Sequence, residues 1–299
     1  MKTSKDCYQT PHIQWSDWQP LFKAGRNKAI PTDAGLYRIR IKGEKTLKYL
    51  GQTGANGRGL RGRLGQLNGI YGELMPYNDP HTAGPALWAL LKDKKVDLEV
   101  SVFTLPSDTK FNRKGMECFA IYCHRKQFGF SPSFNFGRMP VGYSKSSQNN
   151  AALVKAGKRF RGSETKQVLN CHNQSAKIIQ DINAVWGEQR PIGWSSWQSA
   201  KLANFSFDPS GVYVIKSIGN KSATYVGEGN IVSRLKSHLA KGRSDTHPQR
   251  DSFCDPEELY FSFLETSHLE KNQMLEIEND LIGCHVGLFG FPPVAQFLG

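Results

Sequence analysis

The chain has 299 residues, of which 38% are hydrophobic and 22% charged, and its formal net charge is +13. This composition can bury a core, and no apolar run approaches the roughly 20 residues of a membrane helix, which excludes an integral membrane protein. The first residues lack the apolar stretch of a signal peptide, and the six cysteines are scattered without a C-x-x-C pair. We therefore expect a globular, cytoplasmic protein of two domains, without a zinc site or a disulfide framework.

The positive charge is concentrated in the first part of the chain. Residues 1–190 contain 30 Lys and Arg against 14 Asp and Glu, whereas residues 191–299 contain 9 against 12. A basic balance confined to one part of a chain predicts a polyanionic partner, and DNA is the first candidate. A basic surface that only faces water is the alternative.

The first part of the chain alternates β-rich runs with helical patterns. Strands are expected near 35–41, 47–51 and 97–104, and a helix near 114–127. The segment 82–93 predicts a further amphipathic helix. Short strands that alternate with helices are typical of a mixed α/β domain.

Residues 137–190 separate this part from the last third of the chain. Residues 137–165 combine Ser and Asn with clustered Lys and Arg, and we interpret them as a basic extension of the first domain. A plain flexible linker is the alternative, but it fits the Ser/Asn-rich part and not the clustered positive charge. Residues 166–190 are expected to form a mostly helical connector.

The last part of the chain repeats the same order of elements. Strands are expected at 212–215 and 223–226, separated by a Gly-Asn hairpin signal, and at 259–264. Asn230 can cap a helix that runs to about residue 239. A Ser-x-x-Glu capping box at 267–270 predicts a second helix, to about residue 282.

Three landmarks occur twice in the same order, which indicates a tandem duplication. Residues 15–19 (WSDWQ) return as 194–198 (WSSWQ), and residues 128–132 (FGFSP) return as 289–293 (FGFPP). The third landmark is a Gly-x-Tyr tripeptide followed by Tyr-x-Gly, at 35–37 and 49–51 in the first copy and at 211–213 and 225–227 in the second.

The duplication predicts an α/β protein with two copies of a small α/β domain, each with a three-stranded antiparallel sheet flanked by helices. The expected boundaries are 1–136 for the first domain, 137–190 for the basic extension and connector, and 191–299 for the second domain. We expect a monomer with two related domains, or a dimer.

Polar side chains that recur in register are candidate catalytic residues. Tyr37 and Tyr49 are expected on neighbouring antiparallel strands, where facing Cβ atoms lie roughly 5 Å apart and two phenols can orient a water and relay its proton. Glu117 is expected on an apolar helix face, where a carboxylate is costly unless it is paired or binds a metal. Arg63 can clamp a phosphate from the helix after the second strand, and Arg61 is the alternative register. Packing tyrosines, a paired helix-edge glutamate and a solvated arginine are the structural alternatives.

The ordered set of strand tyrosines, helical arginine, helical glutamate and Pro-x-x-Asn resembles the GIY-YIG nuclease family over about 35–136 and 211–297. The resemblance implies a metal-dependent endonuclease that hydrolyses DNA phosphodiester bonds with Mg²⁺ or Mn²⁺. It also implies that the first tyrosine activates water, the arginine stabilises the phosphate, the glutamate binds the metal and the asparagine orders the site. These roles map onto Tyr37, Tyr49, Arg63, Glu117 and Asn135 in the first copy and onto Tyr213, Tyr225, Arg234, Glu278 and Gln296 in the second.

The two copies depart from the family pattern at different positions. Many family members have His or Tyr four residues after the arginine, where the second copy has His238 and the first has Leu67; other histidines, such as His81, receive no role. The second copy replaces the asparagine by Gln296, whose longer side chain is expected to shift the amide. Because the first copy keeps Asn135 and holds the positive charge, we expect it to cut DNA, with the second copy as a weaker site or a structural partner. The residues expected to contact DNA are Arg58, Arg61, Arg138, Lys145, Lys155, Lys158, Arg159 and Arg161.

Several hypotheses about function remain open at this point. A restriction or defence nuclease that acts as a single-chain pseudo-dimer is the first, and a repair or structure-specific nuclease is the alternative within the same class. A catalytically inactive DNA-binding protein belongs to a second class. A protein whose duplicated domain has only a structural role belongs to a third, and it predicts no salt-dependent binding to DNA.

Overall fold

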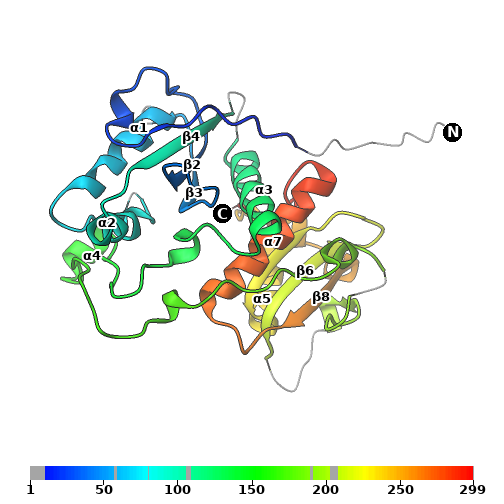
Figure 1. Ribbon diagram of the computed structural model, residues 1–299. Coiled ribbons are helices and arrows are strands. Elements are labelled where there is room, and N and C mark those ends of the chain that lie inside the picture. Colours follow the sequence, from blue (N-terminus) through cyan, green and yellow to red (C-terminus); the bar gives the residue numbers. More distant parts are fainter. Residues whose placement is uncertain are drawn as a thin grey trace. The chain divides into compact units, whose positions relative to one another are not determined.

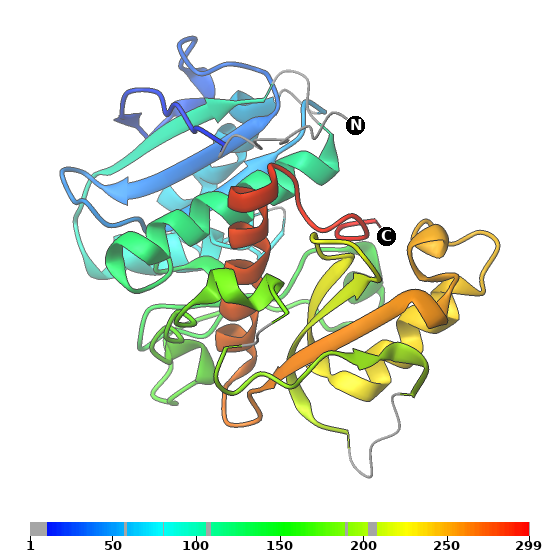
Figure 2. The same cartoon turned by 90° about the vertical axis from the view of Figure 1, so that its right-hand side faces the viewer.

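The computed structural model describes residues 11–56, 59–79, 81–105, 109–188, 191–202 and 208–298. Contacts along the chain divide it into two compact units. The first unit consists of Ile13–Thr109 and His124–Ser175, and the second of Lys110–Cys123 and Ala176–Gly299 with the N-terminal residues up to His12. Figures 1 and 2 show the helices and strands of both. The boundaries at 136 and 191 stay a prediction.

A four-stranded antiparallel sheet forms the centre of the first unit, in the order β1-β4-β2-β3. Its strands are β1 (Gln19–Pro20), β2 (Gly35–Ile41), β3 (Tyr49–Thr53) and β4 (Leu98–Thr104). Successive side chains of a strand alternate between the faces of a sheet, and Leu36 and Tyr37 of β2 are both buried. The sheet is therefore covered on both sides at the start of this strand, while Arg38 and Arg40 are only partly buried.

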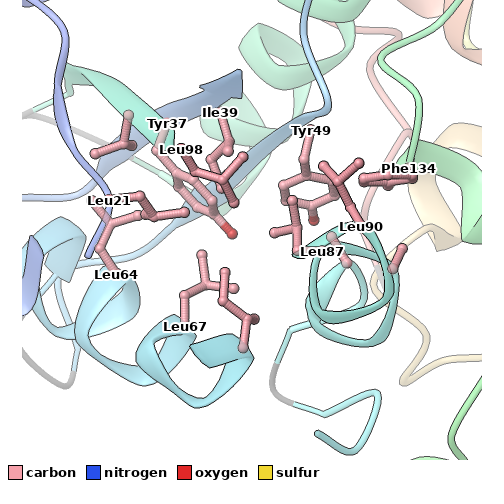
Figure 3. Close-up of a cluster of buried hydrophobic side chains, with 14 of the residues drawn as sticks. Leu21, Tyr37, Ile39, Tyr49, Leu64, Leu67, Leu87, Leu90, Leu98 and Phe134 are labelled. Carbon is pink, nitrogen blue, oxygen red and sulfur yellow. The ribbon is translucent and has the colours of Figure 1, made fainter. Parts of the chain in front are cut away.

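Helices of the first unit pack against the tyrosine-bearing face of the sheet. They are α1 (Gly59–Gln66), the 3-10 helix η2 (Leu67–Tyr71) and α2 (Gly84–Asp93), the last close to the helix expected at 82–93. Figure 3 shows leucines from these helices around the rings of Tyr37 and Tyr49. The two tyrosines are thus part of the core, with only their hydroxyl ends left for chemistry.

The basic extension belongs to the first unit and is mostly loop. It has one short helix, α4 (Ala151–Lys155), whose first turn is capped by the Asn150 side chain. Tyr143 holds the extension to α2 through a hydrogen bond of 2.6 Å from its hydroxyl to the Asp93 carboxylate. The extension is therefore anchored to the first unit at a specific point.

The prediction of a mostly helical connector at 166–190 is wrong. Its described part, 166–188, contains only two short 3-10 helices, η4 (Asn170–His172) and η5 (Ile182–Trp186). Two backbone carbonyls of this segment, those of Asn173 and Gln174, accept from Arg138, which is itself 6% exposed. Backbone carbonyls occupied by an arginine do not need the bonds of an α-helix.

The second unit has a sheet with the same topology, in the order β5-β8-β6-β7. The strands are β5 (Gln198–Ser199), β6 (Ser210–Ser217), β7 (Tyr225–Asn230) and β8 (Leu259–Glu265). Every neighbouring pair is antiparallel, as in the first unit. The structure is thus mixed α/β with two four-stranded antiparallel sheets.

Three α-helices that follow β7 complete the second unit, namely α5 (Ile231–Gly242), α6 (Arg250–Phe253) and α7 (Lys271–Phe289). Figure 2 shows the yellow helix α5 beside the yellow and orange strands of the sheet. None of the helices in the described part of the chain is long and apolar enough to cross a membrane.

The caps of α5 and α7 differ from those expected. Asp208, and not Asn230, accepts the Val232 N–H at the start of α5, at 2.8 Å. The capping box of α7 pairs Glu270 with Gln273 and leaves Ser267 outside the helix. The cap of α7 lies three residues from its expected place, whereas Asp208 precedes Asn230 by 22 positions, because tertiary structure decides which acceptor meets a helix end.

The tryptophan segments provide the fourth strand of each sheet, which the prediction of three-stranded sheets missed. Each segment is held by a serine, Ser16 or Ser195, whose Oγ accepts an N–H of the neighbouring long strand at 3.0 and 3.1 Å. A cation also lies over a tryptophan of each segment, at 4.5 Å for Arg38 and 4.2 Å for Lys216. A short edge strand of two residues gives no clear periodicity in the sequence.

The repeated Phe-Gly-Phe motif encloses a buried histidine at the end of each long helix, α3 (Lys110–Phe128) and α7. Nε2 of His124 and of His285 accepts the N–H of the residue that leads into the second long strand, at 3.1 and 3.0 Å. Nδ1 therefore carries the proton and donates to the carbonyl of the second phenylalanine, at 3.1 and 2.8 Å. These histidines fasten helix, loop and strand together in both copies.

We predict that these histidines make the protein less stable as the pH falls from 6.5 towards 4. Burial lowers the pKa of each to about 4, whereas the unfolded chain keeps the ordinary value of 6.5, so the unfolded chain binds more protons in this window. The stabilisation is fully present above pH 6.5 and is lost on acidification, on the order of 3 kcal/mol for each histidine. Urea unfolding at a series of pH values measures this loss.

The variant His124→Gln/His285→Gln is the control for this prediction. A glutamine amide can donate and accept as the neutral imidazole does, but it does not titrate. We expect the pH dependence between 6.5 and 4 to become shallower. If the double variant keeps the dependence of the original chain, other groups cause it.

Candidate active site

Each copy places its first tyrosine opposite a glycine of the neighbouring strand. Tyr213 of β6 pairs with Gly227 of β7, and Tyr37 of β2 pairs with Gly51 of β3. A Cβ atom at Gly227 would lie 2.5 Å from the Tyr213 hydroxyl oxygen, and one at Gly51 would lie 2.8 Å from that of Tyr37. The glycine of each Tyr-x-Gly tripeptide is thus required by the close approach of the phenol.

Helix α5 brings a histidine and an arginine to the tyrosines of the second copy. Tyr213 and Tyr225 have ring centroids 6.2 Å apart, and Nε2 of His238 lies 2.8 Å from the Tyr213 hydroxyl oxygen. Arg234 interacts with both tyrosine hydroxyl groups through its guanidinium. Burial, followed by the charges of nearby cations, lowers the pKa of His238 to about 3, so its ring is neutral. Hydroxyl, imidazole and guanidinium therefore meet at one point.

Helix α7 adds a carboxylate to the same group. Burial, and then the charge of Glu228, raise the pKa of Glu278 to about 7, while Lys271 and Arg234 oppose the shift. Glu228 comes from β7 and forms an ion pair with Lys271 through one carboxylate oxygen. Its other oxygen is buried and has no hydrogen-bond partner within the described part of the chain. The charge of Glu228 thus acts on Glu278, and one oxygen of Glu228 has no partner among the described residues.

The second copy also replaces the expected asparagine without losing its bond. Gln296 is 4% exposed, and its Oε1 accepts the Val226 N–H at 3.1 Å. In the first copy, Asn135 accepts the N–H of Leu50 at 3.0 Å and donates to the carbonyl of the same residue at 2.8 Å. The longer glutamine side chain therefore reaches the corresponding backbone N–H.

The tyrosines of the first copy have neighbours of a different origin. Tyr37 and Tyr49 have ring centroids 6.0 Å apart, and the Tyr49 hydroxyl lies 3.1 Å from the Thr82 hydroxyl. The ring of His81 lies 6.5 Å from that of Tyr37. His81 and Thr82 belong to the segment 68–86, which has no counterpart in the second copy.

Of the two alternative arginines, Arg63 lies beside this group. Its charge acts on His81, whereas Arg61 donates to the backbone carbonyls of Ile30 (2.7 Å) and Lys28 (3.0 Å). The Nε atom of Arg63 is buried and finds no hydrogen-bond partner among the residues described. Arg61 is thus used to hold a loop, and Arg63 is the candidate for a phosphate.

Glu117 lies in the part of α3 that belongs to the second unit, so both candidate metal-binding glutamates are in that unit. Burial lowers the pKa of Arg113, one helical turn earlier, and the charge of Glu117 opposes this shift. Burial also raises the pKa of the Cys118 thiol, and the charges of Glu117 and Glu278 add to it. The charges of the two carboxylates therefore act on the same thiol.

Helices α3 and α7 approach each other closely in the second unit. The side-chain amide of Asn279 donates to the Cys118 carbonyl at 3.2 Å. A Cβ atom at Gly283 would lie 2.6 Å from the same oxygen and 2.5 Å from the Tyr122 Cβ. Only glycine permits this distance between the two helices.

The residues expected to contact DNA fall into different environments. Arg138 and Arg61 donate to backbone carbonyls, and Lys145 is half-buried beside Cys171, where burial lowers its pKa. Arg58 lies outside the described residues. Arg161 is exposed, stacks on the Tyr77 ring and donates to a backbone carbonyl. The exposed members of the set are Lys155, Lys158, Arg159 and Arg161.

Comparisons with protein-family models, with curated proteins and with solved structures found no match. The resemblance to GIY-YIG nucleases therefore rests on the duplicated motif. Among the described residues, no group of three or more His, Cys, Asp or Glu side chains is arranged to hold a metal ion. A metal at this site would have water or phosphate oxygens among its ligands, as Mg²⁺ commonly has.

Sequence analysis missed three charged or polar residues of the candidate sites. Glu228 and Lys271 were overlooked because the comparison of copies selects shared residues, and Glu228 corresponds to Gln52 in the first copy. His81 was overlooked because it lies in an insertion. A Tyr-x-x-Glu spacing on one strand is the only signal that pointed to Glu228.

We predict that Asn135→Leu destabilises the protein more than Gln296→Leu. The first substitution orphans both the N–H and the C=O of Leu50, each worth about 1–3 kcal/mol when buried without a partner. The second orphans the Val226 N–H. Urea unfolding gives the two free-energy losses, with Asn135→Gln as the control that can keep an amide at the strand edge. Equal, negligible losses would show that water replaces these bonds.

Proposed function

We propose that this protein is a metal-dependent endonuclease that hydrolyses phosphodiester bonds of DNA, with two related sites in one chain. The observation that supports this most directly is the meeting of Tyr213, Arg234 and Glu278 in the second unit, with His238 2.8 Å from the Tyr213 hydroxyl. Phosphodiester hydrolysis needs a group that orients water, a cation that offsets the phosphate charge and a carboxylate that holds a metal. These residue types supply all three.

The proposed reaction adds water across one P–O bond. The water oxygen attacks phosphorus, the bond to one ester oxygen breaks, and the proton that the water loses is balanced by one that the leaving oxygen gains. The bond to His238 fixes the direction of the Tyr213 O–H, so that a lone pair of the phenol can accept the attacking water's hydrogen. Arg234 interacts with both hydroxyls and offsets the charge that develops on the phosphate.

The residues of the second copy fit a divalent cation. The unpartnered, buried oxygen of Glu228 and the carboxylate of Glu278, whose pKa is raised to about 7 by burial and then by Glu228, are the two groups that would hold it. When bound, the cation supplies a Lewis acid for the phosphate oxygen. Lys271 already offsets part of the charge of Glu228, which keeps both carboxylates in place.

The exposed cations of the basic extension are the proposed contact for the DNA backbone. Lys155, Lys158 and Arg159 follow one another on α4 and the loop after it, and all three are exposed. Arg159 also stacks on the Tyr77 ring at 4.0 Å, which orders its side chain. Ordered, exposed cations neutralise phosphates without reading the bases.

Both copies are proposed to cut, each one strand. The basic extension belongs to the same unit as the tyrosines of the first copy, and Asn135 makes two hydrogen bonds to the backbone of Leu50. Both observations support the expectation that the first copy cuts DNA. The second copy has the tyrosine, histidine, arginine and two-carboxylate group within one unit. This is broader than the expectation that the second copy is only a weaker site or a structural partner.

We predict that Glu117→Gln and Glu278→Gln each convert double-strand cleavage of a supercoiled plasmid into nicking. The substitution removes the charge that holds the metal and leaves the shape of the side chain. Combining them is expected to lower the cleavage rate at least about 100-fold. Gel analysis of plasmid with Mg²⁺ or Mn²⁺ measures both effects, and Glu257→Gln, an exposed pair with Lys201, is the matched control.

Two outcomes would change this proposal. If the original chain cuts no form of DNA faster than the double variant does, it is not a metal-dependent nuclease. If Glu278→Gln alone abolishes all cutting, only the second copy is an active site.

We predict that Mn²⁺ raises the melting temperature of the original chain and that Glu278→Gln removes the part of this increase that comes from the second copy. A ligand that binds only the folded state stabilises it by RT ln(1 + [L]/Kd). Glu228→Gln is expected to weaken Mn²⁺ binding about tenfold, because one of two carboxylates remains. Thermal unfolding against Mn²⁺ concentration checks this without any cleavage assay, and identical curves for all variants would exclude the proposed metal ligands.

We predict that Lys155→Ala/Lys158→Ala/Arg159→Ala weakens DNA binding and reduces its dependence on salt. The slope of log Kobs against log salt is negative, and the loss of three phosphate contacts is expected to make it less steep by about 2–3. Titrations of a duplex at two or more salt concentrations measure this slope. The control removes two lysines and one arginine that are exposed in the second unit, Lys221, Lys236 and Arg243, and an equal loss in both triple variants would mean that the extension has no special part in binding.

A further inference from the structure

In the second copy, one histidine contacts both tyrosines of the candidate site. Nε2 of His238 is 2.8 Å from the Tyr213 hydroxyl, and its ring centroid is 4.4 Å from that of Tyr225. The corresponding position of the first copy is Leu67, which is 2% exposed in the apolar core. A leucine cannot hydrogen-bond to a phenol, so the first copy lacks this partner at the helix position.

A histidine of the first copy reaches its tyrosines from a different segment. His81 lies just before α2, and its ring is 6.5 Å from that of Tyr37 with an angle of 77° between the planes. His238 and Tyr213 have corresponding values of 6.0 Å and 62°. The two histidines therefore take similar places against the first tyrosine of their copy.

The electrostatic surroundings of the two histidines also correspond. Burial lowers the pKa of His81 to about 3, with the charge of Arg63 as the next cause. Burial lowers the pKa of His238 to about 3 as well, with Lys241 and Arg234 as further causes. Both rings are therefore neutral, and each offers one N–H and one lone pair.

One ring nitrogen of His81 is hydrogen-bonded to the Arg63 backbone, but this bond does not account for the other ring nitrogen. His81 is 5% exposed, and its Nε2 is buried without a hydrogen-bond partner among the described residues. A polar atom left in this state costs about 1–3 kcal/mol, which an apolar side chain would avoid. The ring also lines a cavity of about 580 Å³ together with Tyr77 and Arg161, so a ligand has room beside it.

We propose that His81 is the residue that positions the Tyr37 hydroxyl in the first copy, in place of the helix histidine that this copy lacks. Its neighbour Thr82 lies 3.1 Å from the Tyr49 hydroxyl, so two adjacent residues of the insertion face both tyrosines. In the second copy, His238 contacts both tyrosines. The expected effect of His81 on cleavage rests on the proposed nuclease function, whereas the pairing of His81 with Tyr37 does not.

The first test measures nicking in a Glu278→Gln background, in which cleavage reports the first copy. His81→Leu is expected to lower kcat by about 10–100-fold and to leave the KM for DNA within about twofold, because Tyr37 is misdirected while the DNA contacts remain. Adding Leu67→His puts a histidine at the position that the second copy uses. This addition is expected to restore at least a tenth of the lost rate, which a loss of packing would not allow.

His172→Leu is the matched control for this test. His172 also belongs to the first unit, and its Nε2 is likewise buried without a partner in the described part of the chain. The same substitution there is expected to leave kcat unchanged. His81→Gln, which keeps a polar side chain, is the second variant should His81→Leu fold poorly.

The second test does not depend on cleavage. In protein labelled with ¹⁵N in histidine, the ring nitrogens of His81 are identified by their loss in His81→Gln and followed by NMR. Tyr37→Phe is expected to shift these nitrogens more than it shifts those of any other histidine, since it removes the hydroxyl that we propose His81 positions. Tyr213→Phe is expected to shift the nitrogens of His238 and to leave those of His81 in place.

The outcomes separate the two proposals. If the Glu278→Gln chain nicks DNA and His81→Leu nicks it equally well, His81 has no positioning role and the nuclease proposal stands. If no variant cuts DNA but Tyr37→Phe shifts the His81 nitrogens, the nuclease proposal fails and the pairing holds. If Tyr37→Phe leaves the His81 nitrogens unchanged, the pairing itself is refuted, whatever the cleavage assays give.

Discussion

Both candidate sites depend on which groups hydrogen-bond to the outer edge of a β-strand. Strands β3 and β7 each have a single neighbour, so one side of each exposes N–H and C=O groups that need partners. Asn135 and Gln296 bond to these groups beside the second tyrosine, and His124 and His285 bond to them where the chain enters the strand. Because the tyrosine, the edge and the loop are fixed together, a segment far along the chain determines where the phenols lie.

The two copies place unlike groups around this common frame. The second copy has Glu228 beside Glu278, and the first has Gln52 at the position of Glu228. The second copy takes its histidine from α5, and the first has His81 from an insertion before α2. Duplication thus preserved the strand register and the edge contacts, while the residues that surround the tyrosines changed separately.

The sequence predicted the long strands and helices well, because hydrophobic periodicity and glycine positions are local signals. It also selected Tyr213, Arg234 and Glu278 as candidates, since a tyrosine, an arginine and a glutamate recur in the same order in both copies. It failed at β1 and β5, which have two residues each and are held by side-chain bonds of Ser16 and Ser195. Such pairings depend on residues distant in the sequence. The same holds for the arginines: Arg61 donates to backbone carbonyls of Ile30 and Lys28, which lie 31 and 33 positions earlier.

The glycine at the crossing of α3 and α7 has a consequence for genetics. Gly283 of α7 lies close to the Cys118 carbonyl of α3. Glu117 is the residue before Cys118, and Glu278 lies five positions before Gly283. Any larger side chain there would push apart the two helices that carry both glutamates. Under the proposed function, a screen for inactive mutants would recover Gly283 with the phenotype of a Glu117 and Glu278 double mutant, although glycine carries no reactive group.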